Sequence, residues 1–259
     1  MAADHPLSED IDLFVNPEKF KPRPGKNKLD RIVKQLAEAI AEHPALTWLT
    51  EQSRTTSGRG REDHFAYDAR FDQLPSVRPV VRLEPGVQSG DFPTEVVPIA
   101  SLVGQFLRER GLGDIAEDTA GFDMTLLHYR RTFVEKLFAL HGKVVRLQEE
   151  QRPLGRDARH YPDLYALACQ PKVTAMLASP EYSDIRLDYD EKSRLYFPKS
   201  HRPPAELSFA SSPAIFPDDE LRMTLASEYE TQCAPLFATR EYPQFELILK
   251  RFAQIRHML

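Results

Sequence analysis

The start of the chain alternates between apolar and polar residues, which is the pattern of a β-strand with one buried face. In residues 6–15 this alternation places two carboxylates, Asp10 and Asp12, on the face opposite the apolar one. The apolar face holds Leu7, Ile11, Leu13 and Val15, and the other face holds Ser8, Asp10, Asp12 and Phe14. Aspartate is depleted in strands, and two carboxylates at i and i+2 repel each other, so the pattern favours a positive partner such as a divalent cation. A solvent-facing edge strand with ordinary acidic residues is the alternative.

Two later segments, residues 64–71 and 77–87, also alternate and predict neighbouring strands of a hairpin. In the second of them Val81 and Leu83 face one side, and Arg82 and Glu84 face the other. Glu84 would add a third acid if this strand lies beside the Asp10 strand. The alternative is an exposed glutamate at a strand end, just before a Pro-Gly turn.

Apolar residues spaced three and four apart predict helices in most of the remaining chain. The predicted helices are residues 28–42, 99–110, 124–148, 157 or 159 to 168, 173–177, 220–237 and 244–258. Residues 45–49 predict a short strand or turn, and residues 185–197 predict a loop or hairpin. A strand-rich first half and a helical second half indicate an α+β fold, with one domain over residues 1–118 and a helical domain over 119–259.

Charged residues at two places in the predicted helices are candidates for a binding site. Lys136 falls on the margin of an apolar stripe, where a lysine either extends its amine to solvent or meets an anionic group. Arg159 and Asp163 are four residues apart on one helix face, which also suits an intrahelical ion pair. The pattern alone leaves both alternatives open.

Charge, hydropathy and cysteine spacing limit the kinds of partner and compartment that the sequence suggests. The 259 residues include 39 acidic and 34 basic side chains, giving a net charge of −5, so the surface as a whole is not a general polyanion binder. Local basic stretches at residues 19–28, 54–61 and 152–159 could bind RNA or be solvated surface. No apolar run is long enough to cross a membrane, and no membrane partner is expected. The two cysteines, Cys169 and Cys233, have no metal-ligand spacing, which fits a reducing cytoplasm.

Four blocks of residues, taken in order, resemble the AbiEii/AbiGii nucleotidyltransferase toxin family. The blocks are Ser-Glu-Asp-Ile-Asp-Leu at 8–13, Arg-Leu-Glu at 82–84 followed by Pro-Thr-Glu at 93–95, Arg-Thr-Phe-Val-Glu-Lys-Leu at 131–137 followed by Leu-His at 140–141, and Ala-Arg-His-Tyr-Pro-Asp-Leu at 158–164. Each block is short, but their order and spacing together are specific. The resemblance implies a DNA-polymerase-β-like fold, in which a mixed β-sheet with flanking helices carries the acids and a helical C-terminal domain follows.

The resemblance also implies a role for each matching residue. Asp10, Asp12 and Glu84 would hold Mg²⁺ or Mn²⁺, and these three with Lys136 and Asp163 would be the catalytic set. Nucleotide binding would involve Ser8, Lys136, Arg131 and Arg159. Phosphoryl transfer depends mainly on positioning and charge neutralisation, which carboxylates, a metal ion and a lysine can provide.

The activity that the resemblance implies is transfer of a nucleotide from an NTP to an acceptor, either an RNA such as tRNA or a protein. It further implies a toxin of a type IV toxin–antitoxin system, acting in abortive infection and phage defence, with a cognate antitoxin. The family begins with a strand and a Gly-Gly-Thr-type turn that binds phosphate, and this sequence starts after that block. We therefore expect a member without its N-terminal block.

Two other functions remain compatible with the sequence. One is an inactive, truncated family member that binds nucleotide or an antitoxin without chemistry. The other is a glycosyltransferase, since these enzymes also use Asp-x-Asp to hold a nucleotide-sugar through a cation. The second would leave the Lys136 and Arg159–Asp163 blocks without a purpose.

Overall fold

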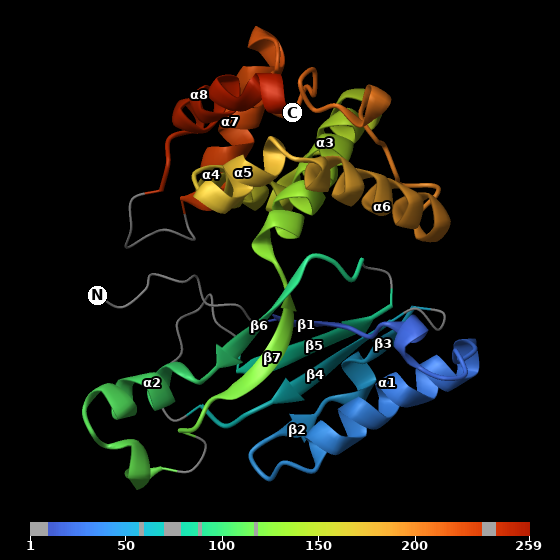
Figure 1. Cartoon of the computed structure of the whole chain (residues 1–259), viewed down its shortest axis with the longest axis vertical. Helices are drawn as coiled ribbons and strands as arrows, with labels where there is room; N and C mark the ends of the chain where they lie inside the picture. Colours follow the sequence, from blue (N-terminus) through green and yellow to red (C-terminus); the bar gives the residue numbers. More distant parts are fainter. Residues whose placement is uncertain (1–9, 57–59, 70–78, 88–89, 117–118, 235–241) are drawn as a thin grey trace. The chain divides into compact units, whose positions relative to one another are not determined.

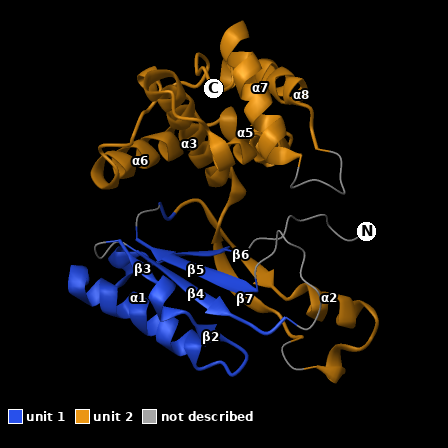
Figure 2. Ribbon diagram, turned by 180° about the vertical axis from the view of Figure 1, so that it is seen from behind, with its two compact units in different colours: residues 1–91 blue, residues 92–259 orange. Residues whose placement is uncertain are grey.

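A computed structural model describes residues 10–56, 60–69, 79–87, 90–116, 119–234 and 242–259. The chain divides into two compact units, Met1–Asp91 and Phe92–Leu259, coloured blue and orange in Figure 2. A mixed β-sheet near the start of the chain is followed mostly by helices, which confirms the predicted α+β class.

Unit 1 is built on a mixed sheet with the strand order β1-β5-β4-β2, and β3 pairs with β4 (Figure 1). Its strands are β1 (Asp10–Phe14), β2 (Thr47–Trp48), β3 (Arg54–Thr55), β4 (Arg61–Ala66) and β5 (Val80–Gly86). β4 and β5 are antiparallel neighbours, as the alternation predicts, and β1 runs parallel to β5. The Asp10 strand therefore lies beside the Glu84 strand, which is the condition under which Glu84 would add a third acid.

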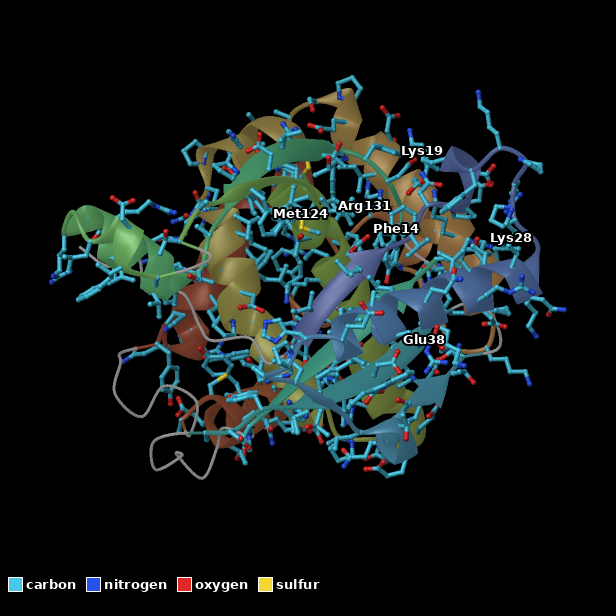
Figure 3. All side chains as sticks on the ribbon, turned by 90° about the horizontal axis from the view of Figure 1, so that it is seen from below. Phe14, Lys19, Lys28, Glu38, Met124 and Arg131 are labelled. Carbon is cyan, nitrogen blue, oxygen red and sulfur yellow. The ribbon has the colours of Figure 1, made fainter. Side chains whose placement is uncertain are left out.

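The helix α1 (Lys26–Ala41) covers the apolar side of this sheet and confirms the helix predicted over residues 28–42. Its buried Ala37 packs with Phe65 of β4 and Leu83 of β5, and Leu13 of β1 joins this small core. The opposite side of α1 is polar and exposed, and Lys28 and Glu38 lie on it (Figure 3). Because the apolar side chains of β1 and β5 turn toward the helix, their polar side chains lie on the other face.

Unit 2 begins with a two-stranded antiparallel sheet that the sequence pattern did not predict. Its strands β6 (Thr94–Ile99) and β7 (Phe122–Leu127) pair antiparallel, and α2 (Leu102–Glu109) lies between them in sequence. The helix predicted from residue 124 begins instead at Tyr129, so its first turns were wrong. Alternating Phe122, Met124 and Leu126 fit a strand as well as a helix, and pairing with β6 decides between the two.

The rest of unit 2 is a helical bundle around one hydrophobic core. Its helices are α3 (Tyr129–Glu150), α4 (His160–Ala168), α5 (Pro171–Leu177), α6 (Pro180–Tyr196), α7 (Asp219–Cys233) and α8 (Phe245–Ile255). Fully buried residues of α3 such as Phe133 and Leu140 pack with Tyr161, Ile185 and Phe252. The predictions for α4, α5, α7 and α8 are confirmed within a few residues, apart from residues 235–237, which lie outside the described part.

The loop or hairpin predicted over residues 185–197 was wrong, because this segment lies in α6. Pro180 occupies the first turn, where the absence of its N–H costs nothing. Tyr182 and Ile185 are buried on the core side. Ion pairs between residues four apart also join Asp188 to Lys192 and Asp190 to Arg194. Many charged residues hid this short apolar stripe in the sequence.

The compact units divide between Asp91 and Phe92, whereas the sequence predicted domains over residues 1–118 and 119–259. Compactness does not by itself define a functional domain, so the predicted domain bounds stay a prediction. In the part of the chain that the structure describes, no helix is long and apolar enough to traverse a lipid bilayer.

Candidate functional site

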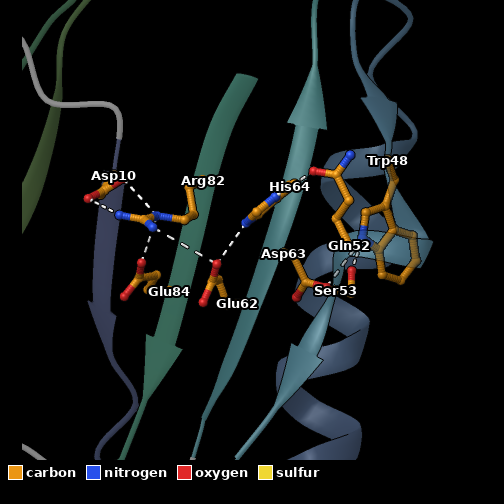
Figure 4. A network of polar contacts seen from close by, with 9 residues as sticks. All are labelled: Asp10, Trp48, Gln52, Ser53, Glu62, Asp63, His64, Arg82 and Glu84. Atoms are coloured by element: carbon orange, nitrogen blue, oxygen red, sulfur yellow. Dashed lines mark hydrogen bonds and ion pairs between the residues drawn. The ribbon is translucent and has the colours of Figure 1, made fainter. Parts of the chain in front are cut away.

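The polar face of β1 and β5 brings the first three predicted site residues together. The parallel register pairs Asp10 with Arg82 and Asp12 with Glu84. Residues paired in this way point to the same side of a sheet, so the three acids and Arg82 share one face. We call this the carboxylate face: Asp10, Asp12, Glu84, Arg82 and, on the next strand, Glu62. Figure 4 shows these residues apart from Asp12.

Arg82 lies between the acids and supplies the positive partner that their repulsion requires. Its Nε lies 2.8 Å from Asp10 Oδ1 and 2.8 Å from Glu84 Oε1, and its Nη2 also pairs with Asp10 Oδ2. Its Nη1 lies 3.9 Å from Glu62 Oε1. The hydrogen bond to Asp10 contributes most to raising the pKa of Arg82 above its ordinary value.

Glu62 and His64 of β4 extend this network, and the sequence analysis missed both. His64 Nε2 lies 2.8 Å from Glu62 Oε1, and its Nδ1 lies 3.0 Å from Gln52 Oε1. The signal was available, because Glu62 and His64 alternate with the buried Asp63 and Phe65. The predicted strand began two residues too late to include Glu62.

A buried ion pair on the other side of β4 fixes this strand. Asp63 is fully buried and accepts hydrogen bonds from Arg61, at 2.7 and 2.9 Å, and from Trp48 Nε1, at 3.2 Å. Burial acts to raise the pKa of Asp63, but hydrogen bonds from Arg61, Ser53 and Trp48 outweigh it and hold this pKa below its ordinary value. Asp63 is therefore a structural acid.

The carboxylate face carries more negative than positive charge. Burial raises the pKa of Glu84, and nearby Asp12, Asp10 and Glu62 raise it further, although Arg82 opposes them. A single guanidinium thus does not neutralise the four carboxylates. The net negative charge of the face would therefore favour the binding of a further cation.

The fit of a divalent metal ion to these residues can be judged from their chemistry and placement. Carboxylate oxygens are the hard ligands that Mg²⁺ and Mn²⁺ prefer, and three of them project from one face. Among the described residues, however, no group of three or more His, Cys, Asp or Glu side chains is placed to hold a metal ion. Asp10 and Glu84 instead contact the Arg82 guanidinium. The carboxylates therefore suit a divalent metal ion by their chemical type and by their shared face, but the ion would have to compete with Arg82 for Asp10 and Glu84.

A second polar cluster lies in unit 2, between α3 and α4. Lys136 Nζ pairs with Asp163 Oδ2 at 2.7 Å and lies 3.4 Å from His160 Nδ1. Burial and the neighbouring Lys136 lower the pKa of His160 to about 4, so its imidazole is neutral at pH 7 and can accept a hydrogen bond from the ammonium. Lys143 and Asp157 form an adjoining ion pair. The sequence analysis identified Lys136 and Asp163 but not Lys143, Asp157 or the contact with His160.

The other predicted residues have different surroundings. Arg131 is 1% exposed, and its guanidinium donates to Phe92 O, Glu135 and Asp188 at 2.7–2.9 Å. Arg159 donates to Arg156 O, while Asp163 pairs with Lys136, so the described contacts include no Arg159–Asp163 ion pair. Ser8 lies outside the described residues. The nucleotide-binding roles of these side chains stay predictions.

A family model described as the nucleotidyl transferase AbiEii toxin of a type IV toxin–antitoxin system matches residues 4–251. No curated protein and no solved structure matches the chain. The match spans both compact units and confirms the resemblance drawn from the four sequence blocks.

Proposed function

Because the chain belongs to the AbiEii nucleotidyl transferase toxin family, we propose that it performs metal-dependent nucleotidyl transfer at its carboxylate face. Asp10, Asp12 and Glu84 hold Mg²⁺ or Mn²⁺ in this proposal, and the substrate is an NTP. One observation supports it most strongly: the register of β1 against β5 puts these three acids on one face of the sheet. Acids scattered over both faces would not support a shared ion.

The proposed mechanism relies on charge and position. The bound metal ion would neutralise phosphate charge and orient the leaving group. The chain's own side chains do the rest. Lys136 binds a phosphate of the nucleotide, and Asp163 keeps its ammonium oriented through their 2.7 Å contact. His160 stays neutral, so Lys136 faces no second positive charge at this position.

The acceptor in this proposal is an RNA, such as tRNA, or a protein. Basic side chains at residues 19–28, 54–61 and 152–159 would contact an RNA backbone. As a type IV toxin, the chain would be kept in check by a cognate antitoxin and would act against phage infection. These partners come from the family assignment, and Arg159 adds a further cation at the start of α4.

A nucleotide-transfer assay tests the proposal. The purified chain is incubated with Mg²⁺, each labelled NTP in turn, and either total tRNA or a protein extract. We expect label to enter one acceptor class with a preferred NTP. The matched controls are the double variant Asp10→Asn/Asp12→Asn and Glu51→Gln, which removes an exposed acid elsewhere in unit 1.

The outcomes separate the candidate functions. Label transferred by the unchanged chain and by Glu51→Gln, but not by the double variant, would support the enzyme. Transfer that survives in the double variant would place the chemistry elsewhere. No transfer to any acceptor, combined with NTP binding by calorimetry, would favour the non-catalytic binding protein.

A further inference from the structure

We propose that Arg82 gates the metal site, because its guanidinium and a divalent cation compete for Asp10 and Glu84. When the cation binds, Arg82 moves to Glu62, which serves as its alternative partner. This inference rests on the proposed function for the identity of the metal-binding acids. It adds a positioning residue that controls when those acids are available.

Arg82 occupies the acids that would bind the cation, which is the first argument for the gate. It pairs with one acid on β1 and one on its own strand, and so connects the two strands that would supply the ligands. Its side chain is 31% exposed and thus has solvent on one side into which it can rotate. An arginine cannot release its proton at any relevant pH, so it must move away before a cation takes its place.

Glu62 provides the second step, because it is already directed toward Arg82. Its Oε1 lies 3.9 Å from Arg82 Nη1, close enough for attraction but longer than a direct hydrogen bond. The same Oε1 lies 2.8 Å from His64 Nε2, and the other ring nitrogen of His64 contacts Gln52. A short rotation would therefore leave Arg82 paired, which avoids the cost of an uncompensated charge.

The charge of the face carries the third step. The carboxylates of Asp10, Asp12, Glu62 and Glu84 share this face with the guanidinium of Arg82. One positive group is too few for the four acids, so a divalent cation and Arg82 together suit them better than Arg82 alone. The gate thus lowers the apparent affinity for metal without removing the site.

A Mn²⁺ titration of the full chain, followed by electron paramagnetic resonance, tests this gate. The variants are Arg82→Gln, Glu62→Gln and the double variant, with Arg31→Gln on the exposed side of α1 as the charge-matched control. We expect Arg82→Gln to bind Mn²⁺ roughly tenfold more tightly than the unchanged chain, since about a tenth of the chain would otherwise be open. Glu62→Gln should bind more weakly, and Arg31→Gln should be unchanged.

The double variant separates gating from simple charge effects. If Glu62 acts by receiving Arg82, Glu62→Gln weakens Mn²⁺ binding much less when Arg82 is already glutamine. Equal effects in both backgrounds would mean that Glu62 acts only through its charge, and would overturn the gate. Unchanged or weaker binding by Arg82→Gln would also overturn it, as would no Mn²⁺ binding by any variant.

A second measurement needs no substitution in the site. In the unchanged chain the Nε–Hε signal of Arg82, assigned by comparison with Arg82→Lys, should shift during a Mg²⁺ titration as Arg82 leaves Asp10 and Glu84. A signal that stays constant through metal saturation would contradict the gate. Transfer activity with no effect of Arg82→Gln on Mn²⁺ affinity would refute the gate and keep the enzyme. If the Arg82 and Glu62 variants change Mn²⁺ affinity as expected but the chain transfers no nucleotide, the gate would be supported and the proposed transfer activity would be refuted.

Discussion

The sheet of unit 1 and the helical bundle of unit 2 are each stabilised by a different kind of contact. In unit 1 the buried apolar cluster is small, with Ala37, Phe65 and Leu83 at its centre, and a chain of ion pairs runs across β1, β5 and β4. In unit 2 the helices surround a large apolar core that reaches from Phe133 in α3 to Phe252 in α8.

The difference shows where each unit can change. The pairs on the carboxylate face are partly exposed, so another cation can replace one partner at little cost. The buried contacts of unit 2 have no such substitute, because removing one leaves a cavity. In the proposed function, the exchangeable face would hold the metal ion, and the helical core would keep Lys136 and Asp163 in fixed positions.

Truncation of the helical core should have the largest effect. Phe133→Ala removes a fully buried ring that stacks on Phe252, and we expect a loss of about 3–5 kcal/mol in the free energy of unfolding. Urea unfolding followed by circular dichroism at 222 nm measures it. The control is Leu195→Ala, whose side chain is 65% exposed and should change stability by less than about 0.5 kcal/mol. Similar losses in both variants would contradict the described core.

Removal of one acid from the carboxylate face should affect activity and not stability. Asp12 is exposed, so Asp12→Asn should unfold at the same urea concentration as the unchanged chain. Its transfer rate should fall about a hundredfold or more, because charge neutralisation of the phosphates is lost. A steady-state transfer assay measures the rate. Full activity of Asp12→Asn would remove this residue from the site.

Acid should weaken unit 2 through its buried histidines. Burial lowers the pKa of His141 to about 4, against about 6.5 in the unfolded chain. Between these pH values the unfolded chain binds more protons than the folded chain. The contribution of His141 to the free energy of unfolding is therefore fully present above pH 6.5 and is lost as the pH falls toward 4. We expect a loss of about 2 kcal/mol from this residue between pH 7 and pH 4.5. Urea titrations at both pH values should show a smaller loss in His141→Asn, and equal losses would contradict the assignment.

The Lys136–Asp163 pair should contribute little to stability. Asp163 is 45% exposed, so Asp163→Asn should change the free energy of unfolding by less than about 1 kcal/mol. Its transfer rate should still fall, since Lys136 loses the partner that orients it. The matched control is Glu246→Gln, which breaks the exposed pair with Arg222 and should leave transfer unchanged. Equal transfer rates in both variants would make the pair structural only.

The sequence predicted the elements whose pattern is local. Alternation located β1 and β5 and assigned Asp10, Asp12 and Glu84 to polar faces, and the register confirms that they share one face. The two-stranded sheet of β6 and β7 was missed because the apolar residues of β7 continue directly into α3, so only pairing with β6 shows where the strand ends.

Side-chain partners were harder to predict than faces. The positive group between the acids could be inferred from their repulsion, but its identity as Arg82 depends on the parallel register of two strands far apart in the sequence. The pairing of Asp163 with Lys136, rather than with Arg159, likewise depends on how α4 packs on α3. Long-range contacts of this kind leave no local pattern.

The central claim is that the carboxylate face holds the catalytic metal, and anomalous diffraction from crystals grown with Mn²⁺ and a non-hydrolysable NTP analogue tests it most directly. We expect an anomalous peak within about 2.4 Å of carboxylate oxygens of Asp10, Asp12 and Glu84, with Arg82 turned toward Glu62. A peak on other residues, with Arg82 still bound to Asp10 and Glu84 in the presence of saturating Mn²⁺ and nucleotide, would contradict the account.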